Sequence, residues 1–277
     1  MGQGNACIEV HGLTLSYGDR AIQRDLSFTV NRGDVFVIMG GSGCGKSTVM
    51  RALIGLKEPA AGQVLYSGVN LWQAEPQVRE RLIRSIGVSY QSGALWSSMT
   101  LAENVALPLE QFTKMSASQV RDLVSMKLSL VGLAGFEDFY PSEISGGMRK
   151  RAALARAMAL DPDVLFFDEP SAGLDPVSAK RLDDLILELR DSLGATVIIV
   201  THELASIFAI GNNSVFLDSD IKTMIATGDP HVLVKESRDP RVRAFLTRGQ
   251  EGGPPAQAGG SDGFRQPVEP GKDTSNG

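Results

Sequence analysis

The chain has 277 residues, of which 43% are hydrophobic and 21% are charged, and its formal net charge is −5. This composition is ordinary for a globular protein, and the charge argues against one whose main task is to neutralise nucleic-acid phosphates. Cys7 and Cys44 are too few for a disulfide framework or a zinc site, which favours a reducing compartment. The sequence has no apolar run near the roughly 18 residues needed to span a bilayer, and residues 1–10 do not resemble a secretory signal.

Two segments of different composition divide the chain. Residues 249–277 are rich in Gly, Pro, Gln and Ser, so they cannot bury enough apolar area to offset the entropy of ordering them. We therefore predict one folded domain over residues 1–248 and a flexible Gly/Pro-rich tail over 249–277. The tail carries a net charge of −2, which, taken from −5, leaves −3 on the domain.

Hydrophobic patterning predicts two kinds of strand. Near the start, residues 8–15 and 26–30 alternate apolar with polar side chains, as antiparallel strands with one solvated face do. Further along, three short apolar runs lack this alternation, which is typical of parallel strands covered by helices. These runs are residues 35–39, 164–167 and 197–200.

Helices are predicted between the apolar runs. Residues 46–56 follow the first run, and residues 116–131 and 178–193 carry apolar side chains at helical spacing. Strands that alternate with helices in this way indicate an α/β fold that binds its ligands at the carboxyl ends of parallel strands.

The strongest motif is a glycine-rich loop at residues 40–48, which fits G-x-x-x-x-G-K-[ST] and lies between a predicted strand and a predicted helix. Glycines let successive N–H groups point inward at nucleotide phosphates, and the helix N-terminus adds its dipole. Lys46 is expected to reach the β- and γ-phosphates, and Ser47 to ligate Mg²⁺. Cys44 is interpreted as a small filler, and a flexible turn is the alternative for the loop as a whole. The residues expected to bind the nucleotide are Gly40, Gly41, Ser42, Gly43, Cys44, Gly45, Lys46, Ser47 and Thr48.

A second motif places two acidic residues directly after the apolar run 164–167. Asp168 is the candidate for holding Mg²⁺ through water, and Glu169 is placed to polarise an attacking water. Alone, such a pair at a strand end is more often a solvated turn. The phosphate loop upstream favours the catalytic interpretation.

With these two motifs and five further segments, the chain resembles the ATP-binding cassette (ABC) ATPases over about residues 8–248. Ser145, Gly146 and Gly147 look like the signature motif and open an Ala-rich segment. The other matching residues are Tyr17, which resembles the aromatic residue that stacks on adenine, Gln91 the Q-loop glutamine, Asp175 the D-loop aspartate, and His202 the switch histidine.

This resemblance implies a fold and an activity. The fold is an ABC-type P-loop nucleotide-binding domain with a RecA-like parallel core sheet, an N-terminal antiparallel β subdomain and a helical signature subdomain inserted at about residues 92–160. The activity is hydrolysis of ATP with Mg²⁺, by two cassettes paired head to tail as a homodimer. The implied catalytic residues are Glu169, His202 and Gln91, the implied metal ligands are Ser47, Gln91 and Asp168, and Tyr17, Ser145, Gly146, Gly147 and Asp175 are implied in binding the nucleotide.

Departures within the signature point to one branch of the family. Ile144 and Met148 stand where the commonest signature has Leu and Gln, and this variant resembles the Mla-type ATPases that serve MCE-domain phospholipid transporters. That branch implies an integral-membrane permease and an MCE-domain substrate-binding protein as partners, allows a small regulatory subunit, and places the chain peripherally on the cytoplasmic side of the inner membrane. The alternatives are an ABC transporter for a polar nutrient, a non-transport ABC ATPase, and a P-loop kinase or GTPase.

Three surface segments receive interpretations of their own. The cluster of Ala94, Leu95, Trp96 and Met99 either contacts the permease or packs inside the helical insert. Residues 239–246 are expected to pack on the other protomer. The basic residues 149–151 are expected to be a solvated helix face and not a nucleic-acid patch, because the domain is acidic.

Overall fold

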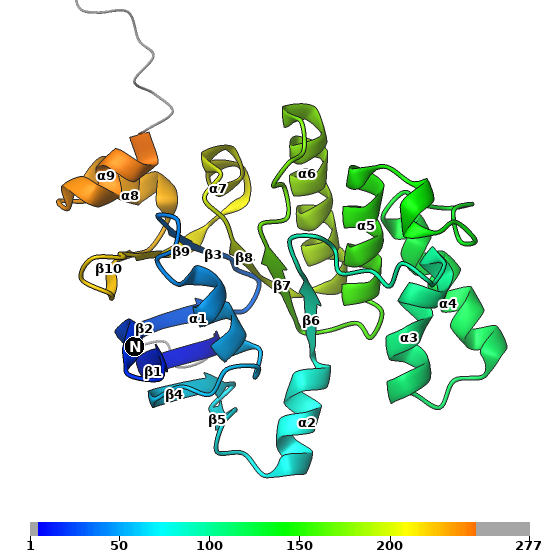
Figure 1. Ribbon diagram of the computed structural model, residues 1–277, viewed down its shortest axis with the longest axis horizontal. Helices are drawn as coiled ribbons and strands as arrows, with labels where there is room; N and C mark the ends of the chain where they lie inside the picture. Colours follow the sequence, from blue (N-terminus) through cyan, green and yellow to red (C-terminus); the bar gives the residue numbers. More distant parts are fainter. Residues whose placement is uncertain (1–4, 248–277) are drawn as a thin grey trace, which may run out of the picture.

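The computed structural model describes residues 5–247, so the predicted tail at 249–277 lies outside the described residues. Its centre is a six-stranded sheet in the order β10-β9-β3-β8-β7-β6, in which β10 alone runs antiparallel to its neighbour (Figure 1). The strands are β3 (Val35–Gly40), β6 (Ile86–Ser89), β7 (Val164–Asp168), β8 (Thr196–Val200), β9 (Asn213–Leu217) and β10 (Met224–Thr227).

A separate antiparallel sheet of four strands, in the order β2-β1-β4-β5, holds the N-terminal part of the described chain. Its members are β1 (Ala6–Tyr17), β2 (Arg20–Asn31), β4 (Ala61–Tyr66) and β5 (Val69–Asn70). Both predicted sheet types are therefore present, and the α/β class is confirmed. The alternating segments 8–15 and 26–30 fall inside β1 and β2, and the apolar runs fall inside β3, β7 and β8.

Helices cover both faces of the central sheet (Figure 1). On one face α1 packs in a core shared with the antiparallel sheet, and on the other α5 and α6 bury the opposite side chains of β3, β7 and β8. The helices are α1 (Lys46–Leu53), α2 (Pro76–Arg84), α3 (Leu101–Phe112), α4 (Ala117–Leu130), α5 (Gly146–Ala157), α6 (Pro176–Leu193), α7 (Leu204–Ile210), α8 (Pro230–Glu236) and α9 (Pro240–Thr247), with a short 3₁₀ turn η1 (Pro141–Glu143).

The side chains of β3 pack into different cores on its two faces, which explains why its apolar run does not alternate with polar residues. Phe36 and Ile38 belong to the core shared with α1, whereas Val37 and Met39 face the core around α7 and α9. Both faces of the strand are buried, so a polar residue on either face would lose its hydration.

The predicted helix boundaries shift for local reasons. The helix expected over 46–56 ends at Leu53, because Gly55 adopts φ +80° and turns the chain away. The helix expected over 178–193 begins earlier, at Pro176, since the Asp175 carboxylate accepts hydrogen bonds from the N–H groups of Val177 and Ser178. The helix expected over 116–131 keeps Ser116 as its N-cap.

The basic segment 149–151 is not the freely solvated face that we expected from the sequence. Arg149 donates to the carbonyl of Ile144, Lys150 to the carbonyls of Pro170 and Ala172, and Arg151 to that of Val131. These cations satisfy backbone acceptors at the ends of neighbouring segments, so they fasten α5 to its surroundings.

The C-terminal helix α9 uses its apolar side chains within its own chain. Val242, Phe245 and Leu246 are buried, and the Phe245 ring packs edge-on against Phe216 of β9 at 5.0 Å. The contact of residues 239–246 with another protomer stays a prediction, and it concerns the outer face of this helix. Between residues 5 and 247, the structure has no helix of the length and apolarity that crossing a membrane requires.

Candidate functional site

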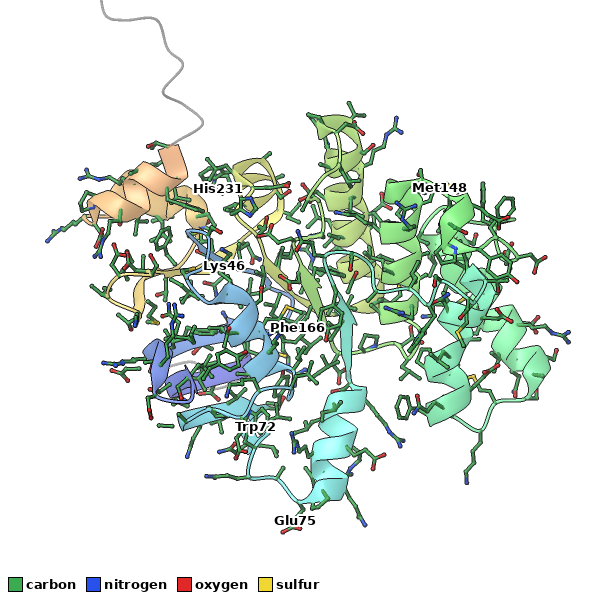
Figure 2. All side chains as sticks on the ribbon, viewed as in Figure 1. Lys46, Trp72, Glu75, Met148, Phe166 and His231 are labelled. Carbon is green, nitrogen blue, oxygen red and sulfur yellow. The ribbon has the colours of Figure 1, made fainter. Side chains whose placement is uncertain are left out.

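A cavity of about 520 Å³ opens at the carboxyl ends of β3, β7 and β8. It draws its walls from five separate stretches of sequence: one lies in β2, and the other four follow or end parallel strands that stop at the same edge of the central sheet. Lys46 lies there at the start of α1 (Figure 2). The lining residues are Ile22, Ser42, Gly43, Gly45, Lys46, Ser47, Thr48, Gln91, Asp168, Glu169 and His202.

The glycine-rich loop is pressed tightly against its neighbours. A Cβ at Gly40, which adopts φ +146°, would lie 2.3 Å from the carbonyl oxygen of Leu217, so only glycine fits. Lys46 is 8% exposed, and its ammonium donates to the carbonyl oxygens of Gly40 and Gly41, each at 3.0 Å. Cys44 is buried beneath the loop, and burial raises the pKa of its thiol.

Two carboxylates meet the loop from the end of β7. The Ser47 hydroxyl donates to Oδ1 of Asp168 at 3.3 Å. Burial raises the pKa of Asp168, and the neighbouring charge of Glu169 raises it further, while the Ser47 hydrogen bond opposes both. Hydroxyl, carboxylate and, from Gln91, amide oxygen form a donor set that suits Mg²⁺. Residues 5–247 contain no cluster of three His, Cys, Asp or Glu side chains that could hold a metal ion by themselves.

Glu169 is held in place by three contacts. Its N–H donates to the carbonyl of Val200 at 2.8 Å, its Oε2 accepts from the Thr201 hydroxyl at 3.3 Å, and its Oε1 lies 2.7 Å from Nδ1 of His202. Its backbone is left-handed, with φ +49°, which costs a non-glycine residue roughly 1 kcal/mol. Such a conformation persists only where the surroundings fix it.

Gln91 and Tyr17 lie at the margins of this arrangement. Gln91 is exposed in the turn after β6 and lines the cavity. Tyr17 ends β1, is 48% exposed and does not line the cavity. A hydrogen bond with Arg51 lowers the pKa of Tyr17, and the Lys57 ammonium lies 4.9 Å from the centre of its ring.

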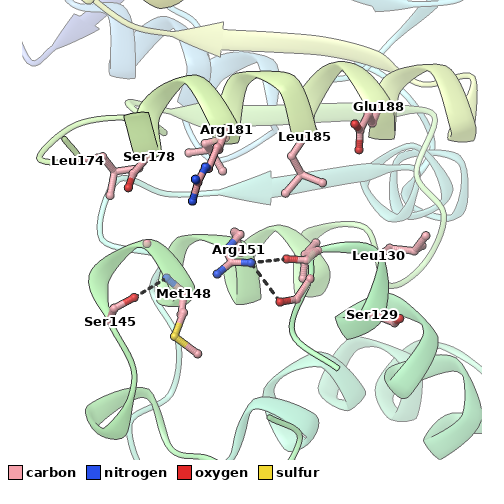
Figure 3. A pocket seen from close by; sticks show the side chains of 14 residues that line it. Ser129, Leu130, Ser145, Met148, Arg151, Leu174, Ser178, Arg181, Leu185 and Glu188 are labelled. Atoms are coloured by element: carbon pink, nitrogen blue, oxygen red, sulfur yellow. Dashed lines mark hydrogen bonds between the residues drawn. The ribbon is translucent and has the colours of Figure 1, made fainter. Parts of the chain in front are cut away.

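The signature residues lie elsewhere. Ser145 caps α5 by accepting from the N–H of Met148 at 3.2 Å, and with Gly147 and Leu174 it lines a second cleft of about 470 Å³ between α5 and α6 (Figure 3). Asp175 serves as the cap of α6, which lowers the pKa of its carboxyl. Within one chain, then, the loop lies with Gln91, Asp168, Glu169 and His202, the signature residues Ser145 and Gly147 line the second cleft, and Tyr17 lines neither.

Several side chains that shape the first cavity are not among the residues predicted from the sequence. Ile22 lines it, Thr201 holds Glu169, and Gln23 supports the loop from below. The position of Thr201 directly after an apolar run was a usable signal. For Ile22 and Gln23 there was none, because their inward positions depend on an irregularity in the β1–β2 pairing between Leu13 and Leu15.

A strand, a glycine-rich loop and a helix in this order define a P-loop protein. Comparison with known proteins narrows this class, since a family model described as "ABC transporter" matches residues 23–172. The chain is 42% identical over 239 residues to the probable ribonucleotide transport ATP-binding protein mkl of Mycobacterium tuberculosis, covering 86% of this chain and 66% of that protein. It is 39% identical over 247 residues to the intermembrane phospholipid transport system ATP-binding protein MlaF of Haemophilus influenzae, covering 89% of this chain and 92% of that protein.

A solved structure of the ABC cassette MJ0796, a dimer in a post-hydrolysis state bound to ADP and Pi, gives a TM-score of 0.72 at 26% identity and covers 80% of this chain and 98% of that one. The chain therefore belongs to the ABC transporter family, and the predicted ABC ATPase fold is confirmed. It spans 66% of the length of the mycobacterial relative.

Helix α6 carries a buried acid. Asp183 on α6 is 3% exposed, and its Oδ1 has no hydrogen-bond partner between residues 5 and 247. Burial raises its pKa to about 6; the charges of Glu203 and Asp184 add to the shift, while a hydrogen bond from Ser206 and the charge of Lys180 oppose it. The Ser206 hydroxyl is also 3.3 Å from that of Ser171.

The raised pKa of Asp183 predicts a pH dependence of stability. Between about pH 4 and pH 6 the folded chain keeps a proton that the unfolded chain has released, so the free energy of unfolding falls as pH rises through that window. We expect Asp183→Asn to remove this loss, which is on the order of 3 kcal/mol at neutral pH. Thermal melts should show the variant gaining several degrees over the wild type at about pH 7.5 and much less at about pH 4. An equal gap at both pH values would contradict the assignment.

Proposed function

We propose that this chain is the ATP-hydrolysing subunit of an ABC transporter complex that moves phospholipids or other lipids between membranes. One observation carries the proposal: in a member of the ABC family, the glycine-rich loop, Asp168, Glu169, Gln91 and His202 surround a single cavity.

The loop would bind the phosphates of ATP. Its N–H groups and the N-terminus of α1 attract anions. Lys46 now donates to two loop carbonyls, and phosphate oxygens would offer it stronger, charged acceptors. Tyr17 would stack on the adenine. Ser47, Asp168 and Gln91 would hold Mg²⁺, which neutralises charge on the β- and γ-phosphates when it is bound.

Glu169 would accept the proton of the attacking water. The Thr201 hydroxyl and the His202 ring hold the two oxygens of its carboxylate, so the acid enters the reaction already oriented. His202, at the edge of the cavity, would donate a hydrogen bond to the γ-phosphate. Both roles depend on the left-handed turn that brings Glu169 back toward the end of β8.

A homodimer would complete the site. Ser145, Gly146, Gly147 and Asp175 do not line the phosphate cavity of their own chain, and Ser145 and Gly147 line the separate cleft between α5 and α6. Head-to-tail pairing would bring these residues to the cavity of a second copy. The dimeric form of MJ0796 supports this arrangement.

The first test replaces the proposed base. Glu169→Gln keeps the shape and removes the charge, so we expect ATP binding to be retained and turnover to fall by about a thousandfold, within the range that loss of general-base catalysis produces. Steady-state phosphate release and ATP binding measure the two effects. Glu236→Gln, at the exposed end of α8, is the matched control. Unchanged hydrolysis by Glu169→Gln would refute the assigned role.

The names of the relatives support lipid as the transported molecule, but they also suggest an alternative transported molecule. The relative from Haemophilus influenzae belongs to an intermembrane phospholipid transport system, whereas the mycobacterial relative is named for ribonucleotide transport. We favour lipid because the signature carries Met148 and Ile144, as the Mla-type ATPases do. The proposed partners are a permease, an MCE-domain protein and a small regulatory subunit, with no nucleic acid, and the proposed location is the cytoplasmic face of the inner membrane, as a peripheral subunit.

A groove between α3 and α4 supports docking of the permease. It has a volume of about 810 Å³, its floor includes the buried side chains of Ala106, Val120 and Val124, and Met99 lies at one end. Trp96, just before α3, is 59% exposed, so its side chain is available to contact a partner and is not buried inside the helical insert. Leu95, in contrast, packs against the core of the insert.

The second test uses this exposed tryptophan. We expect Trp96→Asp to hydrolyse ATP normally as a purified subunit and to lose the permease when the complex is extracted from membranes with detergent. Val232→Asp, which changes another exposed apolar residue, on α8, should keep the permease. Identification of the co-purifying chains separates the two cargo hypotheses: an MCE-domain protein supports lipid, and a periplasmic solute-binding protein supports the polar-nutrient alternative. Retention of the permease by Trp96→Asp would remove this residue from the interface.

A further inference from the structure

Gln23 is a buried polar residue in a stretch of β2 whose other buried side chains, Leu26, Phe28 and Val30, are apolar. It is fully buried, at 0% exposure. It faces inward because the pairing of β1 with β2 is irregular between Leu13 and Leu15, where two residues of β1 are matched by three of β2. Asp25, in this irregular stretch, adopts a left-handed backbone with φ +51°.

The Gln23 side chain joins two backbone segments that are far apart in sequence. Its Nε2 donates to the carbonyl oxygen of Cys44, in the glycine-rich loop, at 2.6 Å, and to that of Asp218, directly after β9, at 3.0 Å. Two acceptors fix the orientation of the amide, because the reversed amide would point its oxygen at both carbonyls. The amide oxygen Oε1 is buried without a partner between residues 5 and 247. Burying an oxygen without a hydrogen-bond partner costs free energy, so a glutamine is an unfavourable choice for a position with a merely structural role.

Strand β2 and the end of β9 both pack closely against the loop at its glycines. A Cβ at Gly45 would lie 2.6 Å from Cγ2 of Ile22, the residue before Gln23. The carbonyl of Leu217, the residue before Asp218, closes on Gly40 in the same way. Asp218 is itself anchored, since its carboxylate accepts from the N–H groups of residues 220 and 221 and from Arg241 of α9. The loop therefore rests on a fixed support, and the Gln23 side chain links that support to the loop at the Cys44 carbonyl.

We propose that Gln23 is a positioning residue that sets the conformation of the phosphate-binding loop through the Cys44 carbonyl. A peptide unit whose carbonyl is held from below directs the following N–H groups toward the cavity. Phosphate affinity depends on how far those groups are arranged in advance. The proposal rests on the nucleotide-binding function argued above, and it assigns to Gln23 no contact with the nucleotide.

The test compares Gln23→Met with Ser214→Ala in the full-length chain. Methionine keeps the length and volume of glutamine and removes both donors. Ser214 is also fully buried and donates to a backbone carbonyl, that of Gly228, but it lies at the other end of β9. Affinities for ATP and for inorganic tripolyphosphate are measured by calorimetry in EDTA, so that no turnover occurs. Tripolyphosphate reports on the loop without the adenine.

We expect Gln23→Met to raise the Kd for both probes about tenfold, and Ser214→Ala to leave both unchanged at a similar loss of thermal stability. In steady-state assays with Mg²⁺, Gln23→Met should raise KM more than it lowers kcat, because the loop holds ground state and transition state alike. Should Gln23→Met not fold, Gln23→Asn, whose shorter amide cannot reach both carbonyls, takes its place with the same expectation. Wild-type affinity in the folded variant, or equal weakening by Ser214→Ala, would overturn the proposal. A wild-type chain that binds neither probe would instead overturn the proposed function, and the wild-type arm alone shows it.

Discussion

Parallel pairing of β3, β7 and β8 is the constraint on which the candidate site depends. Val200 of β8 stands in register with Ile38 of β3 on one side and with Asp168 of β7 on the other. The three strands therefore end together, and the next residues of each leave the sheet at one edge. Those residues begin the glycine-rich loop, carry Glu169 and carry His202, so a pairing register shifted by one residue would separate the carboxylate from both.

The fold also accepts several buried polar groups, and each joins two segments. Gln23 joins β2 to the loop and to the end of β9, and Asp183 on α6 faces Ser206 of α7. Lys127, which is 1% exposed, reaches from α4 to Asp161 beyond α5. Apolar side chains would be cheaper at such positions, since a buried polar group must recover its lost hydration. A polar group adds a directional hydrogen bond or ion pair. The segments fixed in this way flank the cavity and the helical insert.

Much of the arrangement was readable from the sequence. The runs that became β3, β7 and β8 were predicted because strands buried on both faces cannot contain polar residues, and the loop was predicted because lysine and serine follow the last glycine at fixed spacing. The short strands β4, β5, β6, β9 and β10 were missed, since none of them contains four apolar residues in a row. The wrong expectation for residues 149–151 has a different cause. Charge alone predicted solvation, whereas Lys150 and Arg151 donate to backbone acceptors that only the tertiary fold brings near, and Arg149 donates to the nearby carbonyl of Ile144.

The central claim is that the cavity and the signature, separate within one chain, become one site when ATP joins two copies. Sedimentation of the full-length Glu169→Gln variant, with and without ATP and Mg²⁺, tests it most directly, because a variant that binds without turnover holds the joined state. The account predicts a monomer without nucleotide and a dimer containing two ATP molecules with it. A chain that stays monomeric at saturating ATP, or that dimerises with its cavities empty, would contradict the account.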